Sequence, residues 1–354
     1  MWRFPLLLVG SLVASLLASS PALAKDQGAV VGYIAAFKGL DRELQQPGLE
    51  HYTHLILAFV NPTPAGELVG TGGLACSPAG PVSAGPMVSD SQLQTLVTSA
   101  HRRGTEVIAS LGGAVIPPCG GDWAQLLQPQ SRATVVANLI AMVDRYDLDG
   151  LDVDIEGELM TRVDAQGNYT PFIRQLADAL HARSKLLSAA TGSYPGGMAP
   201  DSALPFFDLI GIMSYDQVGP TWGAPGAEHS SYAQAQADLA LWIRKGVPAR
   251  KLALGMPFYG RGFGSYRPGW SLAEIASSFG ERQLGSDVVG QRCGGCSYVT
   301  YNGLPTLERK AALAGAWGAG VMVWEVGQDL PDGRAIRHVV SAYRKGRSYA
   351  ARQH

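Results

Sequence analysis

In the stretch Asp149-Gly150-Leu151-Asp152-Val153-Asp154-Ile155-Glu156, aliphatic and acidic residues alternate from Leu151 onward. Successive side chains of a β-strand point to opposite faces, so the aliphatic residues would share one face and the last three acids the other. A polar face that meets water suits an antiparallel sheet. It does not suit a strand covered by helices, because burying unpaired charge is costly. The role of these acids therefore depends on what surrounds the strand.

The rest of the chain alternates short apolar runs with longer amphipathic stretches. The apolar runs predict strands at 29–37, 54–60, 105–113, 148–156, 185–194, 207–216, 251–259 and 318–326. The amphipathic stretches predict helices at 90–103, 131–146, 169–183, 231–245 and 307–317. Strands that alternate with helices indicate parallel βαβ units, and strands this apolar indicate a sheet covered on both faces.

We therefore predict an α/β fold, a (β/α)8 TIM barrel, with residues 25–354 forming one domain. The alternative is an open, doubly wound sheet that binds a dinucleotide. No G-x-G-x-x-G opens a helix after the first predicted strand, which disfavours this alternative. Residues 262–305 interrupt the alternation of predicted strands and helices, and we interpret them as a small insertion after strand 7.

In a barrel, the aliphatic face of the 149–156 strand would meet the helices and the acids would face the interior. Three acids at successive inward positions repel one another, so at least one should hold a proton at neutral pH. Glu156 is the last of them, at the carboxyl end of the strand, where barrel enzymes place their chemistry. We favour catalysis over metal binding, because adjacent positions on one strand surround a cation poorly. Spacing alone leaves open a retaining glycosidase with a separate carboxylate nucleophile.

Residues 1–24 have the pattern of a secretory signal, with Arg3, an apolar run at 6–17 and the cleavage pattern Ala22-Leu23-Ala24. A membrane anchor is the alternative, but serines interrupt the run and it is short for a span. We expect cleavage before Lys25 and a secreted or periplasmic protein. The formal net charge is −1 without any Lys- or Arg-rich stretch, which argues against nucleic acid as a partner. We expect no membrane partner and a monomer.

Four cysteines in an exported chain favour disulfides. Cys76 follows the second predicted strand and Cys119 the third, so both loops should emerge at the same face of the barrel. We predict Cys76–Cys119 and Cys293–Cys296 bonds. The second pair, a C-x-x-C, is alternatively a redox pair, half of a zinc site or two free thiols. No second C-x-x-C or nearby histidine cluster completes a zinc site.

The segment Asp149-x-x-Asp152-x-Asp154-x-Glu156 resembles the signature of glycoside hydrolase family 18, the chitinases and their relatives. Four further segments are similar to motifs of that family and occur in the same order. They are Ser110-Leu111-Gly112-Gly113, Met213-Ser214-Tyr215-Asp216, Gly255-Met256-Pro257-Phe258-Tyr259-Gly260-Arg261 and Val323-Trp324-Glu325. Together these segments are distributed along the chain from Ser110 to Glu325.

The resemblance implies hydrolysis of β-1,4-linked N-acetylglucosamine polymers or oligomers by a retaining, substrate-assisted mechanism, without metal or cofactor. Glu156 would protonate the glycosidic oxygen, and the substrate's own 2-acetamido oxygen would attack the anomeric carbon. Asp154 would hold the acetamido N–H and share a proton with Asp152 or Glu156. Tyr215 would donate its hydroxyl to the acetamido oxygen.

The resemblance also implies a set of substrate-binding residues around Trp324, which would form the floor under the sugar. The others are Tyr33, Phe59, Gly113, Met213, Asp216, Tyr259 and Arg261. Trp123 and Trp222 lie in predicted loops and either stack on sugars or pack in the core. We assign Trp242 and Trp317, on predicted helices, to core packing.

Two departures from the family pattern suggest a shallow cleft. Ala114 stands where the family often has a tryptophan after Ser-x-Gly-Gly, and Gly157 follows the acid where Tyr-Pro is frequent. An endo-β-N-acetylglucosaminidase on N-glycans or peptidoglycan would use the same machinery and remains an alternative. A chitin-binding lectin without activity is disfavoured, because all four catalytic candidates are present.

Overall fold

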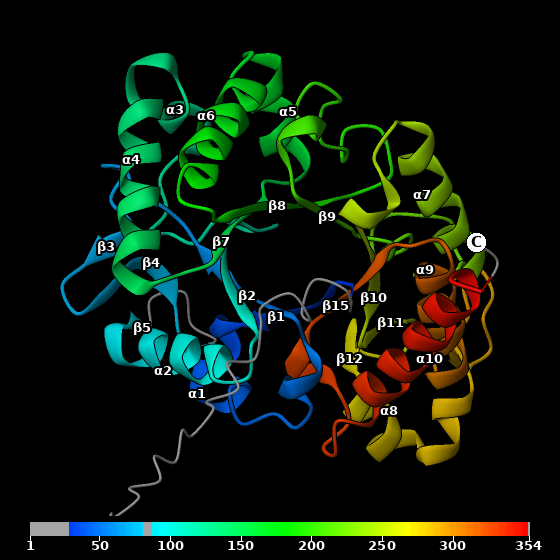
Figure 1. Cartoon of the computed structure of the whole chain (residues 1–354). Coiled ribbons are helices and arrows are strands. Elements are labelled where there is room, and N and C mark those ends of the chain that lie inside the picture. Colours follow the sequence, from blue (N-terminus) through cyan, green and yellow to red (C-terminus); the bar gives the residue numbers. More distant parts are fainter. Residues whose placement is uncertain (1–27, 81–85, 353–354) are drawn as a thin grey trace, which may run out of the picture.

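The computed structural model describes residues 28–80 and 86–352, so the predicted signal at 1–24 lies outside the described residues. Eight parallel strands close a barrel in the order β1-β15-β10-β9-β8-β7-β6-β2, with helices around it (Figure 1). The strands are β1 (Val30–Ala35), β2 (His54–Val60), β6 (Glu106–Gly112), β7 (Gly150–Asp154), β8 (Leu186–Thr191), β9 (Leu209–Ile212), β10 (Leu252–Pro257) and β15 (Gly320–Trp324). The predicted (β/α)8 barrel is confirmed, and each predicted strand contains one barrel strand.

The five predicted helices form close to their expected bounds, and others form that the sequence pattern did not indicate. The expected helices are α2 (Asp90–His101), α4 (Pro129–Tyr146), α6 (Tyr169–His181), α7 (Tyr232–Arg244) and α9 (Leu304–Ala316). The additional helices are α1 (Leu40–Glu43), α3 (Trp123–Leu126), α5 (Gly157–Ala165), α8 (Leu272–Phe279) and α10 (Arg334–Ala350). In the described ranges, no helix combines the length and the apolar character that crossing a membrane requires.

Two smaller antiparallel sheets sit in connections of the barrel. β3 (Val69–Gly70), β4 (Gly73–Pro78) and β5 (Met87–Ser89) lie between β2 and α2. The second sheet has the order β12-β11-β14-β13 and lies with α8 between β10 and α9. Its strands are β11 (Tyr259–Phe263), β12 (Gly269–Ser271), β13 (Val288–Gly290) and β14 (Tyr298–Thr300). This material overlaps the expected insertion at 262–305 and begins a little earlier, at Tyr259.

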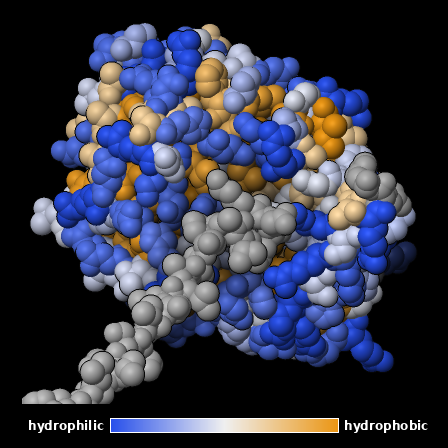
Figure 2. All heavy atoms as spheres, viewed as in Figure 1, coloured by the Kyte–Doolittle hydropathy of each residue, from blue (hydrophilic) through white to orange (hydrophobic). Residues whose placement is uncertain are grey.

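The apolar side chains form two separate clusters, one between barrel and helices and one inside the barrel. Leu151, Val153 and Ile155 belong to the outer cluster. The inner cluster includes Ile56, Ile108 and Met322. The alternation of β7 therefore sends its aliphatic side chains to the helices and its acids inward, as predicted. In the space-filling view, hydrophobic residues show between the hydrophilic ones near the centre of the molecule (Figure 2).

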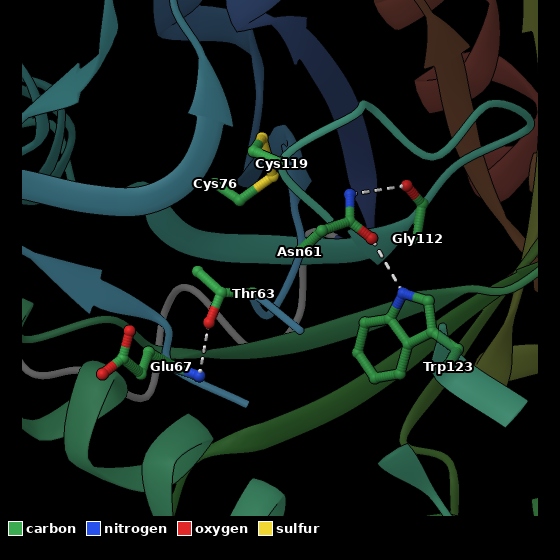
Figure 3. The surroundings of a disulfide bond; sticks show 7 residues. All are labelled: Asn61, Thr63, Glu67, Cys76, Gly112, Cys119 and Trp123. Carbon is green, nitrogen blue, oxygen red and sulfur yellow. Dashed lines mark hydrogen bonds between the residues drawn. A yellow bond between two sulfur atoms is a disulfide. The ribbon is translucent and has the colours of Figure 1, made fainter. Parts of the chain in front are cut away.

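Both predicted disulfides are present. Cys76 on β4 and Cys119 in the connection after β6 are joined, with their Cα atoms 5.6 Å apart (Figure 3). Beside this bond, the Asn61 backbone N–H donates to the Cys76 carbonyl at 2.9 Å. Cys293 and Cys296 are joined with a Cα–Cα distance of 5.2 Å. The free-thiol and zinc-ligand alternatives for the C-x-x-C therefore do not describe its state in the structure, whereas a redox pair in its oxidised form would also be a disulfide.

We expect the two disulfides to stabilise the fold unequally. Cys76 and Cys119 are separated by 43 residues, so losing their bond should lower the free energy of unfolding by about 4 kcal/mol. Cys293 and Cys296 are separated by 3 residues, and the same chain-entropy relation gives about 2 kcal/mol. Denaturant unfolding of the two double Cys→Ser variants measures both values. Equal losses, or the larger loss for the Cys293–Cys296 pair, would contradict this expectation.

Candidate active site

Asp152 is the deepest acid of β7 and is fully buried. Its carboxylate accepts hydrogen bonds from two hydroxyls on the adjacent strands, Ser110 Oγ of β6 and Ser188 Oγ of β8, both at 2.7 Å. It accepts a third from Tyr33 Oη of β1 at 2.9 Å. Burial raises the pKa of Asp152, while the three hydroxyl donors oppose that rise. This carboxylate is thus fixed in place and has its acceptor capacity largely used.

Asp154, one inward position further along, is buried next to two other carboxyl groups. Burial and the charges of Glu156 and Asp152 raise the pKa of Asp154 well above its usual range. Asp154 therefore holds a proton more readily than a free aspartate does, and its interaction with the Glu156 side chain contributes to this. Its Oδ1 atom is buried without a hydrogen-bond partner among the described residues. The arrangement agrees with the expectation that one of the acids holds a proton, and it leaves one acceptor atom available for a ligand.

Glu156 lies just beyond the carboxyl end of β7, at the start of α5, and is half-buried. Burial and the negative charge of Asp216 raise the pKa of Glu156 to about 7, although its hydrogen bond with Asp154 opposes the rise. A carboxyl group with this pKa is protonated in a large fraction of molecules at neutral pH. Glu156 thus has the property that a general acid needs.

Asp216 and Arg261, both expected to bind sugar, form an ion pair with each other. Arg261 donates through Nε and Nη2 to the two carboxylate oxygens of Asp216, at 2.8 and 2.6 Å. Burial alone would raise the pKa of Asp216, but the nearby His229 ring, 3.6 Å away, and the hydrogen bonds from Arg261 hold it well below its usual range. Asp216 therefore stays charged near Glu156. The pairing brings the segment after β9 next to β11, which residue spacing does not reveal.

Tyr215 follows β9 and meets the ring of Tyr259 edge-on, with 6.1 Å between the centroids. Burial and the charges of Asp154 and Asp216 raise the pKa of Tyr215 well above its usual range, so its phenol remains a neutral donor. Gly255 makes room for this ring, because a Cβ atom there would lie 2.8 Å from Tyr215 Cε1. The structure thus places a neutral hydroxyl close to the acid pair.

Trp324, at the end of β15, heads a group of aromatic rings. Phe59 stacks on it at 5.7 Å and Tyr33 lies at 5.4 Å. Phe37 extends the group by stacking on Phe59 at 6.2 Å, and the sequence analysis did not single it out. A Cβ atom on Gly113 would lie 2.7 Å from the Phe59 ring, so glycine is needed there. Met213 packs against the inner cluster of the barrel at the same end.

Two exposed aromatic rings flank the acids. Trp222 is 45% exposed, and its indole N–H donates to the Asp216 carbonyl at 2.8 Å, so its placement suits sugar stacking. Tyr194 is 55% exposed and was not predicted as a site residue. Partial burial and the charges of Glu156 and Asp216 raise the pKa of Tyr194. The one sequence signal for Tyr194 was its position at the carboxyl end of the predicted 185–194 strand.

Two expectations about tryptophans are wrong. Trp123 cannot stack on a sugar, because its ring is fully buried, packs against Phe172 and donates to Asn61 Oδ1 at 2.8 Å (Figure 3). Trp317 is 40% exposed and is not a core residue. Trp242 is fully buried, as predicted. Within residues 28–80 and 86–352, no three His, Cys, Asp or Glu side chains are grouped to hold a metal ion, so the metal interpretation of the acid strand gains no support.

An eight-stranded barrel with a proton-sharing carboxyl pair, a neutral tyrosine and an aromatic floor at its carboxyl end defines a glycoside hydrolase type of site. Residues 29–329 match the family model described as glycosyl hydrolases family 18. The chain therefore belongs to glycoside hydrolase family 18 and has the fold of chitinases and chitinase-like proteins.

Several relatives are named as chitinases or chitinase-like proteins. A chitinase-like effector of Moniliophthora roreri is 29% identical over 71% of this chain and 63% of its own length. A class V chitinase of Arabidopsis thaliana is 26% identical over 67% of this chain and 74% of its own length. The crystal structure of the family 18 chitinase ChiB of Flavobacterium johnsoniae has a TM-score of 0.73 and 29% identity, covering 89% of this chain and 94% of that one. The chain thus spans less than two thirds of the first of these relatives.

Proposed function

We propose that this protein hydrolyses β-1,4-linked N-acetylglucosamine polymers or oligomers with retention of configuration, using Glu156 as general acid and base. The observation that carries the proposal is the Asp154–Glu156 pair, in which burial raises both pKa values beside a neutral Tyr215. A crystal structure of a tobacco class V chitinase variant in complex with NAG4, 20% identical over 89% of this chain, shares the fold with a TM-score of 0.68.

In the proposed mechanism, Trp324 supports the sugar at the cleavage point and Tyr215 donates its hydroxyl to the acetamido oxygen. Glu156 gives its proton to the glycosidic oxygen as the C1–O bond breaks. The acetamido oxygen attacks C1 and forms an oxazolinium ion. The unpartnered Oδ1 of Asp154 accepts the acetamido N–H. Water then opens the ring, and Glu156 takes the proton of that water, so the product keeps the β-configuration.

We also propose export to a secreted or periplasmic location. The two disulfides support this proposal, because such bonds persist in oxidising compartments. N-terminal sequencing of the protein recovered outside the cytoplasm would show Lys25 as its first residue. Recovery of the intact chain from the cytoplasm alone would contradict it.

The substrate is tested by offering chitin oligosaccharides, N-glycosylated protein and peptidoglycan side by side to the purified protein. We expect release of N-acetylglucosamine oligomers from chitin oligosaccharides, with the β-anomer appearing first. Cleavage confined to glycoprotein or peptidoglycan would replace the proposed substrate by that of an endo-β-N-acetylglucosaminidase. Binding to chitin oligosaccharides without cleavage would make the protein a lectin.

The pH dependence follows from the pKa of Glu156. Donation requires the protonated acid, so kcat/KM should fall as the pH rises through about 7. The negative charge of Asp216 contributes to that raised pKa, so Asp216→Asn should move this alkaline limb to lower pH. Asp178→Asn, an exposed acid on α6, is the matched control and should leave the limb in place. If the alkaline limb of Asp216→Asn stays at the wild-type pH or moves to higher pH, the charge of Asp216 does not raise the pKa of Glu156.

A further inference from the structure

Lys310 on α9 is fully buried, although it lies outside the site described above. Its ammonium group contacts three oxygen atoms: Ser230 O at 2.8 Å, Ser230 Oγ at 2.7 Å and Asn302 Oδ1 at 2.7 Å. None of the three belongs to a carboxylate. A buried charge without a directly bound counter-ion is costly, and burial lowers the pKa of Lys310 to about 7, so the position of this lysine calls for an explanation.

The surrounding hydrogen bonds require all three oxygens to accept from Lys310. The Ser230 hydroxyl donates its only hydrogen to the Ser214 carbonyl at 2.6 Å, so Oγ can only accept from the lysine. The Asn302 amide donates to Ser230 O at 2.7 Å, which turns its oxygen toward Lys310. Three acceptors match the three donors of an ammonium group, whereas a neutral amine offers only two.

This network ends on the backbone next to the tyrosine of the site. Ser214 directly precedes Tyr215, and its carbonyl is the acceptor for Ser230. His229 directly precedes Ser230, and its carbonyl accepts the Gln217 N–H at 3.0 Å. Lys310 is thus linked, through residues 229–230, to the backbone on both sides of the Tyr215–Asp216 pair. The buried His229 ring also packs against Tyr259, with 5.2 Å between the centroids.

We propose that Lys310 is a positioning residue for Tyr215, acting through the Ser230 hydroxyl and the Ser214 carbonyl. The proposal rests on the proposed function, in which the Tyr215 hydroxyl orients the acetamido group. Lys310 itself touches no reacting atom. Its removal should shift the phenol relative to Asp154 and weaken an interaction that matters most in the transition state.

The test is a double-mutant cycle on chitin oligosaccharide hydrolysis with Lys310→Met, Tyr215→Phe and the double variant. We expect Lys310→Met to lower kcat by roughly 10-fold while KM changes by less than about 3-fold, in the range of coupling measured within one hydrogen-bond network. In the Tyr215→Phe background the same substitution should change kcat by about 2-fold or less. Equal effects in both backgrounds would overturn the proposal.

Ser230→Ala provides a second route that does not remove the buried charge. It keeps the Lys310 contacts with Ser230 O and Asn302 but deletes the link to Ser214, so it should show the same dependence on Tyr215. If Lys310→Met does not fold, the double-mutant cycle of Ser230→Ala with Tyr215→Phe tests the positioning role in its place. The matched control is Lys251→Met, because Lys251 also donates to a backbone carbonyl, Phe207 O at 2.6 Å, just before β10. It should lower the thermal midpoint while kcat stays within about 2-fold.

A readout independent of turnover separates the two proposals. The 13Cζ signal of Tyr215, assigned by its loss in Tyr215→Phe, should move in Lys310→Met and Ser230→Ala but not in Lys251→Met. If the wild type cleaves no oligosaccharide, the proposed function fails and this signal still tests the positioning role. An unmoved signal in both Lys310→Met and Ser230→Ala overturns that role.

Discussion

Glu156→Gln should lower kcat on chitin oligosaccharides by ~10²–10⁴-fold while leaving their affinity nearly unchanged. The amide has the shape of the carboxyl group but cannot deliver a proton to the leaving oxygen. In the structure, burial and the charge of Asp216 raise the pKa of Glu156 to about 7, so this residue can donate near neutral pH. Initial rates and calorimetric binding, measured on the same oligosaccharide, separate the two quantities.

Glu158→Gln is the matched control, because Glu158 lies two residues further along in the first turn of α5 and is exposed. This variant should retain full turnover. A comparable loss in both variants would mean that the amide disturbs α5 and not the acid. Turnover of Glu156→Gln close to that of the wild type would remove Glu156 from the catalytic role altogether.

The barrel could be predicted because its strands are set by local sequence. Each apolar run is bounded by glycine, polar residues or an amphipathic stretch, and all eight runs contain a barrel strand. The ends were less accurate: the 207–216 run yields only Leu209–Ile212, because the residues after it turn out toward the site. Helix α5 was missed because it starts directly at Gly157 with no side-chain cap, which leaves no local start signal.

The acids of the site could also be predicted, since alternation along one strand sends Asp152 and Asp154 inward. What the sequence could not show were contacts between distant segments. Trp123 and Trp222 both lie in connections after barrel strands. Trp123 is buried and donates to Asn61, whereas Trp222 remains exposed and donates to the Asp216 carbonyl. Lys310 gave no signal at all, because a lysine on an amphipathic helix is ordinarily solvated.

Three carboxyl groups could act as nucleophile in place of the substrate's acetamido group. Each of them is hydrogen-bonded, ion-paired or has a raised pKa. Asp152 accepts three hydroxyl hydrogen bonds, and Asp216 is paired with both donor nitrogens of Arg261. Asp154 is left, and burial beside Glu156 and Asp152 raises its pKa well above the usual range, which makes it a weaker nucleophile because the neutral carboxyl group is favoured. The geometry therefore favours a nucleophile supplied by the substrate.

An oligosaccharide whose 2-acetamido group at the cleavage point is replaced by hydroxyl should accordingly be hydrolysed at least ~10³-fold more slowly, because it lacks the intramolecular nucleophile. A thiazoline that mimics the oxazolinium ion should inhibit, and Tyr215→Phe should weaken that inhibition, since the phenol donates to the same position. Affinity for the 2-hydroxy compound, measured in Glu156→Gln, serves as the control that it still binds. If the 2-hydroxy compound binds and is cleaved at a rate comparable with the acetamido substrate, Asp154 or Asp152 acts as a conventional nucleophile. The raised pKa of Asp154 would then have to fall when substrate binds, and Asp154→Ala, not the loss of the acetamido group, would be the change that abolishes turnover.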